Sequence, residues 1–226
     1  MKGSVREFTV YIYFSTTAEM PGDTGFTFSC VGTAAVKRAL QKLAPKTAVG
    51  VDNIPITVFK MAWSALAIPL VHIVNLVITT GEWPNEWKES LITPVLKKGK
   101  PRLEIGSYRP VALLCAVSKL VERVLYDQLI DHVESQGLLP PEQHGYRQNR
   151  GVDTALASML LQVARAIDKG LKVGISAFDY SAAFDTVEPA VLNRKLAWAS
   201  GKARKLIIDY MNAGKQRVKW MGPYRK

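Results

Sequence analysis

Apolar residues recur every three or four positions along much of the chain, a spacing that is typical of helices with one buried face. The pattern predicts helices over 33–43, 56–79, 117–133 and 153–169, and a mostly helical segment over 190–213. Turn-forming residues close these segments at Pro45, Gly81, Gly137 and Gly170. Thr33 and Asp153 are the expected N-terminal caps of the first and fourth helices.

Three other stretches predict strands. "SLITPVLKKGK" is a short strand that leads into a basic turn, and "SYRPVALL" is extended because Pro110 disfavours a helical conformation at Arg109. "LKVGISAF", residues 171–178, has the composition of a buried strand. Helices that alternate with few strands indicate an α+β fold with a small sheet.

The first 32 residues form a leader to which we assign no structure, although "FTVYIYF" is strand-like. They lack the features of a secretory signal peptide. Residues 63–78 are the most apolar run, but Ser64, Pro69, His72 and Asn75 interrupt it. We therefore expect a buried helix rather than a membrane span, and no membrane partner.

The net charge of +11 favours a polyanionic partner, nucleic acid more than membrane. Residues 186–226 contain ten Lys or Arg against Glu188 and Asp209, so this segment carries +8 of the +11. A second basic group consists of Lys97, Lys98, Lys100 and Arg102. A single lysine is more often part of a solvated face, but the total excess is not explained in that way.

Cysteine and histidine give no sign of a disulfide framework or a zinc site. Cys30 and Cys115 lie far apart, which is typical of a protein from a reducing compartment. The histidines His72, His132 and His144 have no metal-ligand spacing.

The stretch "GISAFDYSAAFDTVEP" contains two aspartates, Asp179 and Asp185. Asp179 follows the predicted strand 171–178, a common position for a catalytic or metal-binding acid. Six residues of extended chain span about 20 Å, and six residues of helix separate two side chains by about 240° around the axis. Asp179 therefore needs a carboxylate from elsewhere, and Asp185 is either a helix cap or a catalytic residue.

Several motifs together resemble a known family. "AFDYSAAFDTV" is similar to the first catalytic block of reverse transcriptases of non-LTR (LINE-type) retrotransposons. "WKESLITPVLKKGK" and "SYRPVALLCAVSKLVERVL" resemble the blocks that precede it, and "APKTAVGVDNIP", "QHGYRQNRGVDTAL" and "YMNAGKQRVKWMG" match further blocks in order. The resemblance covers about residues 26–222. It implies a right-hand polymerase, mostly helical with a small antiparallel sheet, with fingers over 33–170 and an incomplete palm over 171–226.

The resemblance also implies the partners and the catalytic chemistry. The family copies an RNA template from a DNA primer with deoxynucleoside triphosphates, using Mg²⁺, with Mn²⁺ as an alternative ion. Asp179 falls on the first catalytic aspartate, a ligand to both metal ions. Phe184 falls on the residue that packs beneath the deoxyribose and excludes a 2′-hydroxyl, and Ala183 lines the same pocket. Asp185 is implied to be structural.

Other positions carry over from the fingers of the family. Lys97 and Arg109 are implied to neutralise the triphosphate, the lysine as a point charge and the arginine as a bidentate fork. Gln143, Gly145 and Arg147 match a block that holds the fingers against the palm and contacts template. For Arg147, a purely structural hydrogen bond is an equal alternative.

Two family blocks are absent from the 226 residues: the aromatic-Ala-Asp-Asp block and the Gln-Gly block. We therefore expect no polymerisation by this chain alone. The main alternative is a non-catalytic nucleic-acid-binding remnant of a decayed element. A group II intron-type reverse transcriptase and a phosphatase or nuclease that uses Asp179 also stay open, and the resemblance implies an intracellular location, nuclear or cytoplasmic.

Overall fold

The computed structural model describes residues 25–45, 48–178, 183–184, 186–212 and 214–218. These residues divide into two compact units. The larger unit lies within Gly22–His132 and Glu188–Lys226, and the smaller unit within Val133–Val187. The expected strand "FTVYIYF" lies outside the described residues.

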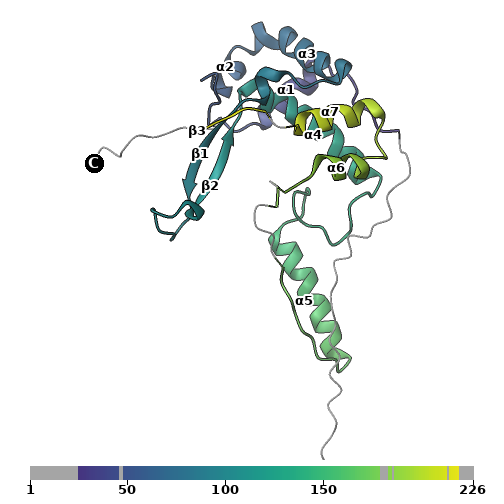
Figure 1. The fold of residues 1–226 in the computed structure, drawn as a ribbon. Coiled ribbons are helices and arrows are strands. Elements are labelled where there is room, and N and C mark those ends of the chain that lie inside the picture. The colour runs from purple at the N-terminus through teal and green to yellow at the C-terminus, as the bar shows by residue number, and fades with distance from the viewer. Residues whose placement is uncertain (1–24, 46–47, 179–182, 185, 213, 219–226) are drawn as a thin grey trace, which may run out of the picture. The chain divides into compact units, whose positions relative to one another are not determined.

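Helices make up most of the larger unit (Figure 1). They are α1 (Thr33–Lys42), α2 (Ile56–Met61), α3 (Trp63–Thr80), α4 (Ala116–Ser135), α6 (Pro189–Lys195) and α7 (Gly201–Met211), with 3₁₀ turns η1 (Asn85–Lys88) and η2 (Ile105–Ser107). The last turn of α4 belongs to the smaller unit, which also contains α5 (Val152–Asp168). The predicted helices are thus confirmed, and the fold is of the predicted α+β class.

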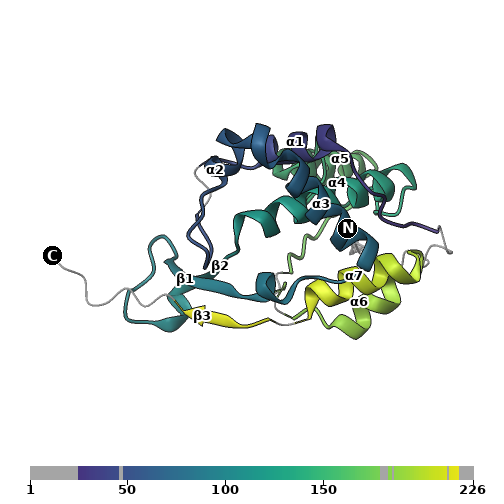
Figure 2. The same ribbon diagram turned by 90° about the horizontal axis from the view of Figure 1, so that it is seen from above.

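The core of the larger unit forms where α1, α3, α4 and α7 bury one face each. Its most deeply buried aliphatic side chains are Val36, Leu40, Val74, Leu120, Val121 and Leu206. Helix α1 packs on α3, and α6 packs on α7, as Figure 2 shows. The α1–α3 contact bridges the loop and helix α2 between them, whereas α6 and α7 are consecutive helices joined by a short connection.

Two side-chain amides fasten the segment that precedes α1. The Asn75 side chain accepts a hydrogen bond from the Val31 amide (2.7 Å) and donates one to the Val31 carbonyl (3.0 Å). Gln128 makes the same pair of bonds with Ser29. Each amide replaces the partner that a neighbouring strand would supply, so the extended backbone is satisfied without a sheet.

Helix α3 is buried on one side only, which corrects the expectation of a buried helix. Leu70, Val74 and Val77 are buried, but Ile68 is 78% exposed. By length and composition alone α3 could cross a membrane, although 22% of its residues are buried and core helices of soluble proteins meet the same criterion.

The sheet has three strands in the order β2-β1-β3. Strand β1 (Ser90–Leu96) pairs antiparallel with β2 (Tyr108–Leu113), which confirms the two predicted strands. Strand β3 (Gln216–Val218) pairs parallel with β1, so the sheet is mixed and the expectation of an antiparallel sheet was wrong for this strand. Only Ser90–Ile92 of β1 contact β3, and beyond them β1 and β2 continue as a two-stranded hairpin in which Pro94 faces Pro110.

The expected buried strand over 171–178 is not present. These residues carry no assigned strand, and Phe178 is 89% exposed. A strand requires a neighbour to accept and donate its backbone hydrogen bonds, and no described residue pairs with this segment. The segment is apolar, as the sequence shows, but its burial in a sheet depends on a neighbouring strand, which composition does not reveal.

Both predicted helix caps were displaced by one or two positions. Thr33 is the first residue of α1, and the N-cap position is taken by Gly32, without a side-chain hydrogen bond. Helix α5 begins after Gly151, whose amide donates to Thr154 Oγ1 (2.9 Å), so Asp153 lies inside the first turn. The carboxylate of Asp153 still lies at the positive end of the helix dipole.

Candidate functional site

Lys97 and Arg109 lie on the same face of the β1–β2 hairpin. Arg109 is opposite Val95 in the register, and side chains two residues apart on a strand share a face. The Lys97 amide donates to the Ser107 carbonyl (2.8 Å), which continues the pairing past the end of β1. The fold therefore brings together the two cations that the sequence predicted to act on one triphosphate.

The two cations differ in how they are held. Lys97 Nζ donates to the Gly106 carbonyl (2.9 Å), which fixes the ammonium over the hairpin turn and leaves its other protons for a ligand. The Arg109 side chain is exposed and has no hydrogen bond or ion pair with the described part of the chain. An exposed guanidinium beside a tethered ammonium can bind an anion with little desolvation cost.

The loop 48–54 packs against the end of β2 and leaves no space for a side chain at Gly50. A Cβ built at Gly50 would lie 2.5 Å from the Cys115 amide nitrogen. Lys119 Nζ donates to the Ala48 carbonyl (2.6 Å), and burial lowers the pKa of this lysine. The loop is thus tied to the same hairpin that holds Arg109.

In the smaller unit, Arg147 is a structural centre of the loop 138–151. Its Nε and Nη2 atoms bind the Glu134 carboxylate bidentately at 2.8 and 2.5 Å. Its Nη1 donates to the carbonyls of Pro140 (2.9 Å) and Gln143 (3.3 Å). The hydrogen bonds from Arg147 hold the pKa of Glu134 below its ordinary value, and they raise the pKa of Arg147.

The other two residues of this block are exposed. The side chain of Gln143 has no partner among the described residues, whereas its backbone takes part in the turn. A Cβ at Gly145 would meet no described atom within 4 Å, so local packing does not require glycine there. Their predicted role in template contact stays a prediction.

Phe184 contacts an aromatic residue that the sequence did not single out. The rings of Tyr146 and Phe184 are T-shaped, with centroids 5.8 Å apart and planes at 81°. Tyr146 has φ of 60°, a left-handed conformation that is uncommon for a bulky residue. Since Arg147 anchors the loop next to it, the loop presents the Tyr146 ring outward, and no sequence pattern signals this conformation.

Asp179 and Asp185 lie outside the described residues. Ala183 is exposed, and its carbonyl accepts a hydrogen bond from Thr186 Oγ1 (2.9 Å). Within the described ranges, no group of three or more His, Cys, Asp or Glu is arranged to hold a metal ion. The predicted roles of Asp179, Asp185 and Ala183 thus stay predictions.

A partly buried polar cluster joins α4 to α7. Ser118 Oγ donates to Glu122 Oε1 (3.2 Å), and the Tyr210 hydroxyl is hydrogen-bonded to the same carboxylate. Burial raises the pKa of Glu122. Burial and the neighbouring Glu122 charge raise the pKa of Tyr210 to about 12. Glu122 and Tyr210 line a mostly apolar cavity of about 470 Å³, which the sequence could not reveal because the two helices are distant along the chain.

A second, more polar cavity of about 610 Å³ lies between η1 and α7. It is lined by Lys88, Arg204 and Lys205, together with Asn85, Asn193, Asn212 and other residues. Asp209 accepts hydrogen bonds from Lys88 (2.6 Å) and the Trp83 amide (2.7 Å). Burial opposes ionisation of Asp209, but these bonds outweigh it and keep its pKa below the ordinary value. Asp209 is thus a structural acid paired with Lys88, and the second acid of the cavity, Glu82, pairs with Lys205.

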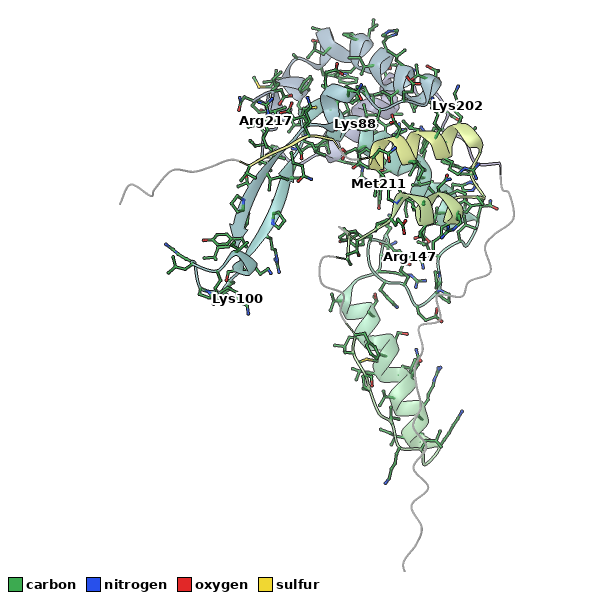
Figure 3. All side chains as sticks on the ribbon, viewed as in Figure 1. Lys88, Lys100, Arg147, Lys202, Met211 and Arg217 are labelled. Atoms are coloured by element: carbon green, nitrogen blue, oxygen red, sulfur yellow. The ribbon has the colours of Figure 1, made fainter. Side chains whose placement is uncertain are left out.

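Basic side chains also follow the hairpin to its free end, where Figure 3 shows Lys100. Arg217 of β3, labelled in Figure 3, forms an ion pair with Glu89, the residue before β1. The hairpin thus carries a run of basic residues, whereas both lysines of the cavity are paired with acids.

Comparison with known proteins places these features in a family. Residues 95–224 match the family described as reverse transcriptase (RNA-dependent DNA polymerase). The RNA-directed DNA polymerase from mobile element jockey of Drosophila funebris is 28% identical over 184 residues, 81% of this chain and 20% of that protein. The probable enzymes from transposon BS and transposon X-element of Drosophila melanogaster are 29% and 32% identical, over 67% and 50% of this chain and 17% and 12% of their own lengths.

The chain thus spans a fifth or less of the curated relatives named above. The family match covers more than half of the 226 residues and includes Lys97, Arg109, Arg147 and Asp179. The resemblance to reverse transcriptases of non-LTR retrotransposons is confirmed. The chain belongs to the reverse transcriptase family.

Proposed function

We propose that the chain is the fingers, residues 33–170, and the first part of the palm, residues 171–226, of an RNA-directed DNA polymerase, preceded by a leader over 1–32. In the complete enzyme the 3′-hydroxyl of a DNA primer attacks the α-phosphate of a deoxynucleoside triphosphate opposite an RNA template. The family match and the mobile-element relatives support this assignment. The net charge of +11 supports a nucleic-acid partner.

One observation carries the proposal: Lys97 and Arg109 share an exposed face of the β1–β2 hairpin. A triphosphate needs several positive donors from one direction, and this face supplies an ammonium and a guanidinium. Lys97 is held by Gly106, so it is positioned before a ligand arrives. In our proposal these two residues neutralise the β- and γ-phosphates as the leaving group develops charge.

Phe184 and Ala183 form the proposed sugar pocket. The Phe184 ring is 73% exposed, so its face is accessible to a ligand. Its contact with Tyr146 supports one orientation of the ring. A ring fixed beneath the sugar would clash with a 2′-hydroxyl and favour deoxynucleotides.

Asp179 is the proposed first ligand of Mg²⁺, or of Mn²⁺ in its place, with Asp185 as a structural neighbour. Two-metal transfer requires several carboxylates that converge on both ions. Asp179 supplies one, and the described residues offer no group of three metal-binding side chains. Because the described residues do not bring further carboxylates together, we propose that the purified chain does not extend a primer. Detectable primer extension by the purified chain would refute this proposal.

Nucleotide binding tests the proposed role of the hairpin. We expect Arg109→Ala to weaken binding of a fluorescent deoxynucleoside triphosphate about tenfold or more, because a charge-assisted bidentate contact is lost. Arg109→Lys should restore only part of the affinity. Arg38→Ala is the matched control, since Arg38 is also exposed in the larger unit but lies on α1. Equal effects of the Arg38 and Arg109 substitutions would contradict the proposal.

A non-catalytic nucleic-acid-binding protein is the second candidate. The exposed, unpaired segment 171–178 favours it, because a working palm holds its catalytic strand in a sheet. Asp179→Asn separates the two functions. Binding of template and primer persists in both cases, whereas loss of Mg²⁺-dependent nucleotide binding is expected only for the polymerase.

A further inference from the structure

The polar cavity of about 610 Å³ beside α7 has no part in the function proposed above. Its volume is typical of a site for a small organic ligand. Among the described residues that line it are three cations, Lys88, Arg204 and Lys205, and two acids, Glu82 and Asp209. These side chains together carry a charge of +1, so the cavity favours an anion over a cation.

Ion pairs determine which of the three cations is left for a ligand. Lys88 Nζ lies 2.6 Å from Asp209 Oδ1, and Lys205 Nζ lies 2.9 Å from Glu82 Oε1. The side chain of Arg204 is half-buried and makes no hydrogen bond or ion pair with the described residues. A guanidinium is always protonated, and its N–H donors match phosphate oxygens in pairs. Arg204 is therefore the candidate anion-binding group of the cavity.

Helix α7 arranges the lining residues in two lines along its axis, because residues four positions apart lie above one another on a helix. Lys205 and Asp209 form one line, and both are committed to ion pairs. Arg204, Ile208 and the C-cap residue Asn212 form the neighbouring line. This second line is about 12 Å long, since each helical residue rises about 1.5 Å. A guanidinium, an aliphatic side chain and a carboxamide thus follow one another along the cavity.

Carboxamides from two other elements complete the lining. Asn85 comes from η1, and Asn193 comes from α6, which packs beside α7 (Figure 2). Together with Asn212 they are exposed, and their side chains have no hydrogen-bond partner in the part of the chain that the structure describes. A carboxamide offers an acceptor and two donors in one plane. Asparagine uses this pattern to pair with the edge of adenine.

The combination of groups favours a nucleotide over smaller ligands. An inorganic phosphate would bind Arg204, but it would leave the carboxamides without a partner and fill a small part of the cavity. A nucleoside would pair with a carboxamide and leave the guanidinium unused. A nucleotide satisfies both ends, and the half-buried Ile208 between them offers apolar surface to the sugar and the base.

We propose that this cavity is a second nucleotide site, which binds an adenine nucleotide with its phosphate on Arg204, its base edge on Asn212 and Ile208 between them. The ligand is either a free nucleotide such as AMP or an adenosine nucleotide of an RNA strand, because both present the same groups. The site is additional to the triphosphate site proposed on the hairpin, since neither Lys97 nor Arg109 lines the cavity.

Calorimetric titration of the chain with AMP, adenosine and inorganic phosphate tests this site. We expect AMP to bind at least about tenfold more tightly than adenosine or phosphate, because only AMP engages both ends. R204A should weaken AMP binding about tenfold or more and leave the affinity for adenosine unchanged. R204K should restore part of the loss, because lysine keeps the charge without the fork. N212A should reduce the preference for AMP over CMP.

R194A is the matched control, because Arg194 is an exposed arginine on α6 that does not line the cavity. Both alanine variants should keep the wild-type circular dichroism spectrum, since alanine is a good helix former. R204K and N212A carry the comparison if R204A does not fold. Equal losses of AMP affinity in R194A and R204A would overturn the site. So would AMP binding that is no tighter than phosphate binding.

Displacement of bound AMP by single-stranded RNA distinguishes the two sources of the nucleotide. Displacement by an oligoadenylate and not by an oligouridylate of the same length would assign the site to an adenosine of an RNA strand. Retention of AMP in the presence of both strands would assign it to a free nucleotide. Equal displacement by the two strands would overturn the recognition of adenine.

The outcomes also separate this site from the proposed function. Loss of AMP binding in R109A, with AMP binding intact in R204A, would overturn the second site and leave the hairpin site standing. Binding of a deoxynucleoside triphosphate without any binding of AMP would do the same. Binding of AMP that depends on Arg204, in a chain whose triphosphate binding does not depend on Arg109, would support the second site and overturn the proposed role of the hairpin.

Discussion

The larger and smaller units differ in what their apolar residues contact. In the larger unit, Val36, Leu120 and Leu206 are almost fully buried where helices from distant parts of the chain meet. In the smaller unit, α5 has the same helical spacing of apolar residues but no buried residue, and Leu160 is exposed. Periodicity therefore predicts that a helix forms, and it does not predict that a partner covers the apolar face.

The largest expected effect is on the core of the larger unit. Leu206→Ala should lower the free energy of unfolding by about 2–5 kcal/mol, because it leaves a cavity in a closed core. Leu160→Ala on α5 should change it by less than about 1 kcal/mol. Urea unfolding followed by tryptophan fluorescence and circular dichroism checks both values. Similar losses for the two variants would break the distinction between the units.

A smaller difference is expected for two glycines. Gly50→Ala should destabilise the larger unit by about 1–3 kcal/mol, because the new Cβ overlaps the backbone at Cys115. Gly174→Ala in the smaller unit meets no described atom within 4 Å and should be neutral or slightly stabilising. The midpoints of thermal unfolding compare them. A neutral Gly50→Ala would mean that loop 48–54 does not pack against β2 in solution.

The pH dependence of the larger unit should reveal Glu122. Its folded-state pKa is raised by burial, so the folded state binds the proton more tightly than the unfolded chain. Stability from this group is present at low pH and is lost as pH rises from about 4.3 through the raised pKa. Glu122→Gln removes this pH-dependent contribution to the free energy of unfolding. The difference in unfolding free energy between wild type and variant should therefore change steadily with pH across this window, and a constant difference would contradict the assignment.

In the smaller unit, the pH dependence expected from Glu134 has the opposite sign, and it concerns only the loop 138–151. Arg147 lowers the pKa of Glu134, so the pair stabilises the loop above about pH 4.3 and the contribution is lost as pH falls through the lowered pKa. Glu134→Gln should increase hydrogen exchange in residues 138–151 at pH 7, and the increase should become smaller as the pH falls below about 4.3. The exchange of α1 serves as the internal control. Unchanged exchange at pH 7 would mean that Arg147 does not organise the loop.

The sequence predicted what depends on local pattern. The spacing around Leu120 and Val121 identified α4, and Pro110 identified the extended conformation of β2. It failed where the outcome depends on distant contacts. The segment 171–178 has the composition of a buried strand but lacks a described neighbour.

The candidate site, like the fold, was predicted from the sequence only in part. Motifs identified Lys97 and Arg109, and only the register of the hairpin put them on one face. The parallel strand β3 was missed, because three residues carry too little pattern. The left-handed backbone of Tyr146 and the contact of Glu122 with Tyr210 were missed because both depend on tertiary structure.

The central claim is that the exposed face of the β1–β2 hairpin binds the nucleotide. Hydrogen–deuterium exchange of the wild-type chain, measured with and without a deoxynucleoside triphosphate and Mg²⁺, tests this claim most directly. The account predicts slower exchange in residues 90–113 and no change in α3, with the protection lost in Arg109→Ala. Protection elsewhere in the chain, with the hairpin unaffected at saturating nucleotide, would contradict it.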